Sequence, residues 1–120
     1  MPRVANVLVA TLLVVTGCTP PACQDGPDRK LQHDVELVVK DDGPIGQAAA
    51  ARLVERGRES ILVLETGLYG AEPPARLRII RTLRDIGSRE AGPILDHLAA
   101  NDADPAVREA ARSAALTLTR

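Results

Sequence analysis

The stretch that decides the fold runs from Pro74 to Leu116 and reads PARLRIIRTLRDIGSREAGPILDHLAANDADPAVREAARSAAL. Apolar residues of its first part recur at spacings of four, four and three, namely Ala75, Ile79, Leu83 and Ile86. These spacings place the four side chains on one face of a helix. Gly87 follows that face and permits the left-handed turn at which helices commonly end. The stretch therefore predicts a helix, a tight turn and then further helix.

The same pattern recurs outside this stretch, with a period of about 30 residues. In each unit an acid stands three places before an apolar helix start, as Asp42 before Ile45, Glu72 before Ala75 and Asp104 before Val107. Each gap holds a proline, and a glycine follows two of the first helices, at Pro44, Pro74, Pro105, Gly57 and Gly87. The acid can cap exposed N–H groups, and proline suits the first helical turn. We predict that each unit is helix, turn, helix, loop.

The segment from Pro74 to Leu116 resembles bacterial HEAT-like repeats of the short type, which begin Pro-x-Val-Arg and place an acid before each unit. The resemblance implies an all-α fold, a short α-solenoid of about two and a half helical-hairpin repeats over residues 29–120. It also implies a ladder of charges between stacked repeats, at Glu72, Arg76, Asp104 and Arg108. The first unit departs from the pattern because Gly46 stands where arginine is expected. A generic helical bundle is the alternative.

The N-terminal residues 1–17 read MPRVANVLVATLLVVTG, a short basic start followed by an apolar run. A membrane-spanning helix needs about 20 apolar residues, so this run is too short to be one. The prolines at 20 and 21 follow it directly and cannot continue a helix. The pattern is typical of a secretory signal.

The end of that run, Val15-Thr16-Gly17-Cys18, resembles the bacterial lipobox. The resemblance implies cleavage of residues 1–17, lipid on the Cys18 thiol and a lipid-anchored protein of the cell envelope. Thr19 is not aspartate, which in Gram-negative lipoproteins favours the outer membrane. Two or three acyl chains would make the anchoring nearly permanent. The alternatives are a secretory signal with a chance cysteine and an uncleaved anchor.

Residues 18–28 follow as a predicted tether, since they are rich in proline, glycine and aspartate. Cys23 in this tether is either free or paired with another chain. Residues 31–40, LQHDVELVVK, place apolar side chains at helical spacing, although their valines would also suit a short strand. We expect a helix there, because no second strand is evident to pair with.

Composition narrows the possible functions. The chain has 15 basic and 16 acidic residues, a balance that gives no strong attraction to nucleic acid. His33 and His97 have no second histidine or cysteine at metal-ligand spacing, and no glycine-rich phosphate loop is present. We therefore expect no enzyme, no cofactor, no metal site and no small-molecule substrate. Five arginines stand at positions 76, 78, 81, 84 and 89. They either form salt bridges between stacked repeats and solvated surface charges, or they form a basic stripe for an anionic partner.

The sequence thus predicts a membrane-anchored interaction scaffold. The second helices of the repeats, around residues 58–68 and 90–100, would form the face that binds an unidentified protein. The alternative is a purely structural component of an envelope assembly without a discrete ligand. With Tyr69 as the sole aromatic residue, the chain lacks most of the side chains that dominate interface hot spots. We therefore expect modest affinity, strengthened by confinement at the membrane.

Overall fold

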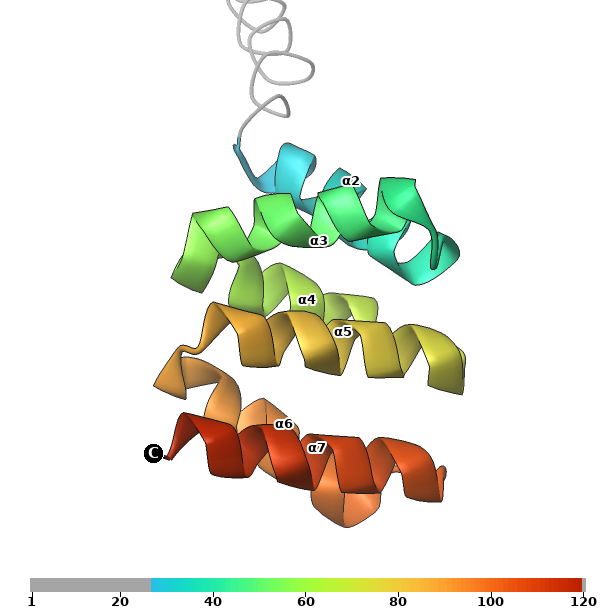
Figure 1. The fold of residues 1–120 in the computed structure, drawn as a ribbon, viewed down its shortest axis with the longest axis vertical. Coiled ribbons are helices and arrows are strands. Elements are labelled where there is room, and N and C mark those ends of the chain that lie inside the picture. Colours follow the sequence, from blue (N-terminus) through green and yellow to red (C-terminus); the bar gives the residue numbers. More distant parts are fainter. Residues whose placement is uncertain (1–26, 120) are drawn as a thin grey trace, which may run out of the picture. The chain divides into compact units, whose positions relative to one another are not determined.

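The computed structural model describes residues 27–119, and their secondary structure is entirely helical (Figure 1). The helices are α2 (Pro27–Lys40), α3 (Pro44–Arg56), α4 (Ile61–Gly67), α5 (Pro73–Ile86), α6 (Gly92–Asn101) and α7 (Pro105–Leu118). Short 3-10 helices, η1 (Gly57–Ser60) and η2 (Arg89–Ala91), precede α4 and α6. The all-α prediction is confirmed for these residues. The predicted leader, Cys18 and Cys23 lie outside them.

The chain divides into two units, residues 1–30 and residues 31–120, and the description below concerns the second. The helix expected over residues 31–40 is confirmed as part of α2. That helix begins at Pro27, so the last two residues of the predicted tether, Pro27 and Asp28, belong to it. Proline is tolerated in a first helical turn, where its missing N–H would have no partner.

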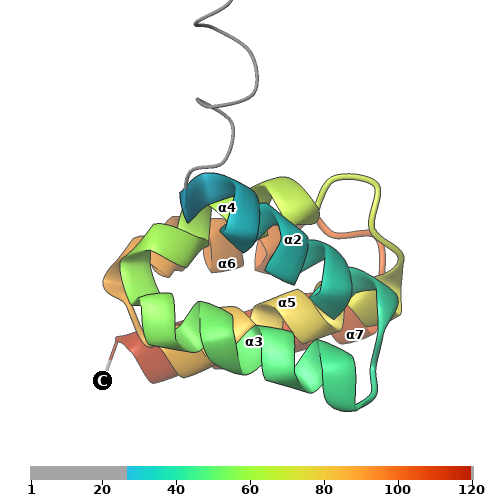
Figure 2. The same cartoon turned by 90° about the horizontal axis from the view of Figure 1, so that it is seen from above.

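The helices of the second unit are arranged in successive pairs (Figures 1 and 2). The first helices α3, α5 and α7 lie on one side of the unit, and α4 and α6 lie on the other. Contacts join α3 to α5, α5 to α7 and α6 to α7. Consecutive first helices therefore pack on each other although about 30 residues separate them in the chain.

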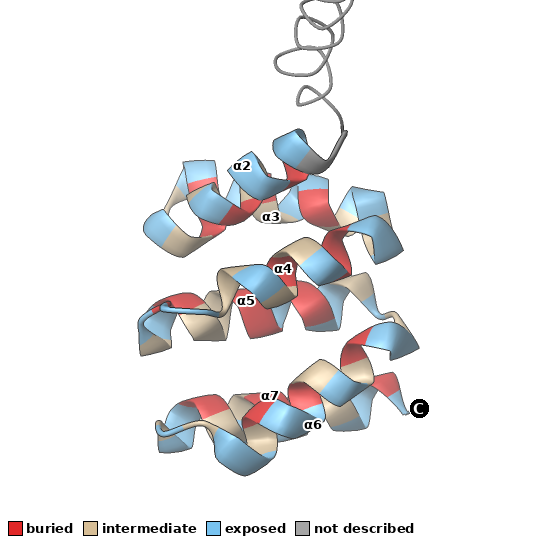
Figure 3. Ribbon diagram, turned by 180° about the vertical axis from the view of Figure 1, so that it is seen from behind, coloured by how far each residue is buried: buried red, intermediate tan, exposed pale blue. Residues whose placement is uncertain are grey.

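A continuous aliphatic core lies between these helices, and buried positions alternate with exposed ones along each of them (Figure 3). Its fully buried large side chains include Leu53, Leu64, Ile79, Leu83, Leu95 and Val107. The apolar face predicted for α5 is confirmed, since Ala75, Ile79 and Leu83 are all buried. The repeat positions Leu53 and Leu83 are equivalent in sequence and equally buried.

The first of the three repeats, which begins with α3, departs from this pattern of burial at the start of its helix. Ile45, the apolar residue at this helix start, is 62% exposed, whereas the neighbouring Gly46 is buried. A Cβ added to Gly46 would overlap the backbone oxygen of Asp41 and lie 2.8 Å from its carbonyl carbon. The end of α2 thus crosses the start of α3 so closely that only glycine fits. This contact explains why the arginine of the repeat pattern is missing at position 46.

The close contact between Asp41 and Gly46 also changes which acid forms a hydrogen bond at the start of α3. The Asp41 carboxylate accepts a 2.8 Å hydrogen bond from the Gly46 N–H, whereas the sequence pattern pointed to Asp42. The backbone N–H groups of Gly46 and then Gly43 lower the pKa of Asp41 below its usual range, because they stabilise the charged carboxylate. Asp41 therefore contributes to stability above the ordinary aspartate pKa. That contribution is lost as the pH falls through the lowered value.

Replacing Gly46 with alanine is expected to destabilise the domain by about 1–3 kcal/mol, because backbone atoms of Asp41 must move aside. The measurement is the free energy of unfolding of the full chain, from urea titration followed by circular dichroism. Gly92→Ala is the matched control, since nothing lies within 4 Å of its added Cβ. Equal unfolding free energies for the two variants would contradict this packing.

The other helix boundaries test the predicted caps. Asp104 is the N-cap of α7, and its side chain accepts hydrogen bonds from the next helix residues, at 2.8 and 3.3 Å, as predicted. Glu72 occupies the N-cap position of α5, but its side chain makes no capping hydrogen bond. The left-handed turn predicted at Gly87 is confirmed, since its φ and ψ angles are 72° and 12°. Gly57 also has a positive φ angle of 63°, but its ψ angle of −126° lies outside the left-handed helical region.

Candidate interaction groove

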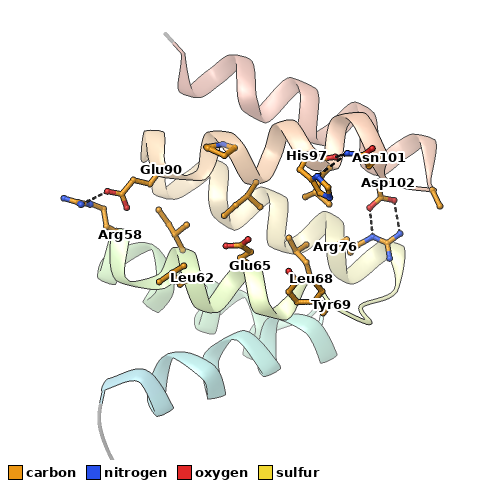
Figure 4. Close-up of a pocket in the computed structure, with 15 residues that line it drawn as sticks. Arg58, Leu62, Glu65, Leu68, Tyr69, Arg76, Glu90, His97, Asn101 and Asp102 are labelled. Atoms are coloured by element: carbon orange, nitrogen blue, oxygen red, sulfur yellow. Dashed lines mark hydrogen bonds and ion pairs between the residues drawn. The ribbon is translucent and has the colours of Figure 1, made fainter.

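A groove of about 770 Å³ lies between α4 and α6, the two second helices (Figure 4). Most of its lining comes from within residues 58–68 and 90–100, the ranges from which the sequence predicted a binding face. The lining residues outside these ranges are Tyr69, Arg76 of α5, Asn101 at the end of α6, and the loop residues Asp102 and Ala103.

The α4 wall combines apolar side chains with one acid. Ile61 and Leu64 face the core and are buried, which leaves Leu62 and Glu65 on the outer face of this short helix. Tyr69 follows Leu62 by seven places and lies just past the helix end. Leu62 is 73% exposed and Tyr69 is 79% exposed. Large apolar side chains that share one exposed face mark a candidate interaction surface.

The α6 wall repeats this arrangement. Ile94, His97 and Asn101 line the groove at spacings of three and four, so they share one helix face. Asn101 Nδ2 lies 3.2 Å from His97 Nδ1 and donates a 3.1 Å hydrogen bond to the His97 carbonyl oxygen. Leu98 lies behind them and is mostly buried. The groove therefore has apolar residues in both walls and polar groups near its ends.

One end of the groove carries an exposed ion pair. Arg58 of η1 and Glu90 of η2 approach within 2.5 Å, and both side chains are more than half exposed. Exposed pairs of this kind contribute at most about 1 kcal/mol, because water screens the charges and two long side chains are ordered. This pair therefore shapes the end of the groove more than it stabilises the fold.

The other end carries a largely buried ion pair between Arg76 of α5 and Asp102, which follows α6. Arg76 Nη2 donates a 3.0 Å hydrogen bond to Asp102 Oδ1, and Nε lies 2.9 Å from Oδ2 without hydrogen-bond alignment. Only 5% of the Asp102 side chain is exposed. Its Oδ1 also accepts a 2.9 Å hydrogen bond from the Asp104 N–H. Asp102 thus joins one helix pair to the next.

The charges predicted as a ladder have more varied roles than a simple stack. Arg76 crosses to the next unit, and its partner there is Asp102, whereas Asp104 caps its own helix. Arg108 donates hydrogen bonds to the loop carbonyls of residues 102 and 103, at 2.7 and 3.2 Å. Glu72 is exposed at the start of α5.

The arginines considered as a basic stripe are largely engaged within the fold. Arg78 donates to the carbonyl oxygens of Val38 and Val39, the last turn of α2, where a cation complements the helix dipole. Arg84 pairs with the neighbouring Asp85 at 3.2 Å. Because Arg78 has this internal role, the series does not present one continuous basic surface.

No group of three or more His, Cys, Asp or Glu side chains within residues 27–119 is placed to hold a metal ion. None of the helices there combines the length and apolar character needed to cross a bilayer. We found no match to the chain among protein-family models, curated proteins or solved structures.

Sequence reasoning located the groove but missed the residues that define it. Tyr69 was noted only as the sole aromatic residue, and its position seven places after Leu62 could have assigned it to the same face. Glu65 was not singled out among the charged residues of the chain. Asp102 gave no signal, because Asp104 in the same loop fits the repeat pattern better.

Proposed function

We propose that this protein is an envelope lipoprotein, held at a membrane through lipid on Cys18, whose helical domain binds another protein. The binding surface is the groove between α4 and α6. The observation that carries the proposal is the exposure of two large side chains, Leu62 and Tyr69, along one wall of that groove. Burying a leucine side chain contributes roughly 1.5–3 kcal/mol, so these side chains are well placed to be covered by a partner.

We infer further that the domain is a short α-solenoid of HEAT-like repeats. Support comes from the period of about 30 residues, from the positive-φ glycines at 57 and 87 and from the packing of α3 on α5 and α5 on α7. In such an array each repeat contacts its neighbours, and the second helices share one face. The groove lies on the face that α4 and α6 share.

Membrane attachment compensates for the sparse aromatic content of the groove. Hot spots at interfaces are enriched in Trp, Tyr and Arg, and Tyr69 is the single aromatic side chain in the chain. A groove of this kind gives modest affinity on its own. Confinement of both partners to one membrane raises their effective concentration and makes a weak contact sufficient.

Photocrosslinking in intact cells tests the proposal. A photoreactive residue replaces Leu62, which is exposed enough to change without disturbing the core, and Leu116 on α7 is the matched exposed control. We expect one dominant crosslinked partner from position 62 and none of that species from position 116. A similar spread of neighbours from both positions would contradict recognition through the groove and would favour a purely structural role.

A further inference from the structure

The charges that line the groove are paired at both ends and unpaired in the middle. Arg58 pairs with Glu90 at one end, and Arg76 pairs with Asp102 at the other. Glu65 lies between these pairs, and no ion pair or hydrogen bond reaches its carboxylate from within residues 27–119. Two arginines against three acids leave the groove with one negative charge, and that charge belongs to Glu65.

Glu65 occupies the centre of the apolar α4 wall. It follows Leu62 by three places and precedes Tyr69 by four, and it projects into the groove between them (Figure 4). A partner that covers Leu62 and Tyr69 must also cover Glu65. Removing water from a carboxylate is costly unless a cation or hydrogen-bond donor replaces that water. The groove therefore disfavours a wholly apolar occupant and selects one with a positive charge at its middle.

The spacing of the wall also suits a helical occupant. A helix rises about 1.5 Å per residue, so the seven residues from Leu62 on α4 to Tyr69 in the turn after it span about 10 Å. An amphipathic helix presents anchors at positions i and i+7 with the same separation, and its i+3 or i+4 side chain lies midway between them. The described residues contain no strand whose free edge could pair with an extended peptide.

We propose, resting on the proposed function, that the groove binds an amphipathic helix carrying a single lysine or arginine. Its apolar anchors cover Leu62 and Tyr69, and its basic side chain pairs with Glu65. The ion pairs of Arg76 and Arg58 neutralise the charged groups at both ends. They leave Glu65 as the group that distinguishes partners. Specificity thus comes from the single charge of Glu65 in an apolar wall. A partner with an acidic side chain opposite Glu65 is strongly disfavoured.

A displayed library of designed helical peptides tests the proposal with the full-length chain. Each 14-residue peptide carries leucine at positions i and i+7, with i+3 and i+4 randomised over all residues. Selection on the wild-type chain is expected to enrich lysine or arginine at one of the two positions. Selection on Glu65→Lys is expected to enrich aspartate or glutamate at that same position.

The dissociation constant of the best peptide supplies the quantitative test. Glu65→Lys is expected to weaken binding of the lysine peptide by about tenfold or more, and exchanging the peptide lysine for glutamate restores it. Glu65→Gln, which keeps the shape and removes the charge, is expected to have a smaller effect in the same direction. The control is Glu36→Lys on α2, outside the groove, which leaves binding unchanged.

Several outcomes would overturn the proposal. These are the absence of any enriched peptide, enrichment without a basic residue, and equal binding by the wild-type and Glu65→Lys chains. A tightly held small apolar molecule that blocks the peptides would do the same, since the groove volume lies in the range of small-molecule sites. If the peptide tests fail but a single partner is still crosslinked at Leu62, only the claim that this partner is a basic amphipathic helix is overturned. Loss of that crosslinked partner overturns the proposed function itself.

Discussion

Replacing Asp102 with alanine is expected to destabilise the domain by about 3–5 kcal/mol, because the change leaves the Arg76 guanidinium buried without its counter-charge. Arg76 is only 18% exposed and cannot turn fully into water. The Asp104 N–H loses its acceptor at the same time. The substitution therefore removes both the ion pair from Asp102 to α5 and the hydrogen bond from the Asp104 N–H to Asp102.

The measurement is again the free energy of unfolding of the full chain in urea. The matched control is Glu90→Ala, which breaks the exposed pair with Arg58 and should cost no more than about 1 kcal/mol. A double variant, Arg76→Met with Asp102→Leu, is expected to recover most of the stability lost in Asp102→Ala, since it removes both buried charges. Equal unfolding free energies for Asp102→Ala and Glu90→Ala would show that Asp102 does not hold the helix pairs together.

Replacing Cys18 with alanine is expected to abolish lipid attachment and, with it, stable membrane association. Each buried CH₂ group of an acyl chain contributes about 0.8 kcal/mol to membrane binding, so two or three chains hold a protein almost irreversibly. No side chain other than a cysteine thiol can accept the lipid in a lipobox. The measurement is incorporation of labelled palmitate, together with the distribution of the protein between membrane and soluble fractions.

Cys23→Ala is the matched control for Cys18→Ala, because it removes the only other thiol of the chain. We expect labelling and fractionation of Cys23→Ala to equal those of the wild type. Persistent labelling of Cys18→Ala, or loss of label in Cys23→Ala, would show that Cys18 is not the lipidated residue.

Local periodicity predicted the features of the fold that depend on neighbouring residues. Spacings of three and four identified the buried face of α5, and the glycine at 87 marked its end. The helix over residues 31–40 was expected because no strand partner was evident, and it is present. The cap at Asp104 was also predicted, since capping involves atoms only two or three residues apart.

Contacts between distant segments were harder to predict. Gly46 appeared as a gap in the repeat, and the backbone of Asp41 that excludes any side chain there shows only in three dimensions. The partner of Arg76 is Asp102, 26 residues later, and the repeat pattern pointed to Asp104. Glu65 was not singled out, because the sequence does not show which exposed charges lack a partner. The face of the groove was predicted, and the residue that would give it selectivity was not.

The proposed function depends most directly on lipid at Cys18, and the mass of the mature N-terminus tests it. Mass spectrometry of the protein extracted from membranes is expected to find a chain that begins at Cys18 and carries a diacylglyceryl group on its thiol. A chain that retains Met1, or that carries an unmodified Cys18, would contradict the account.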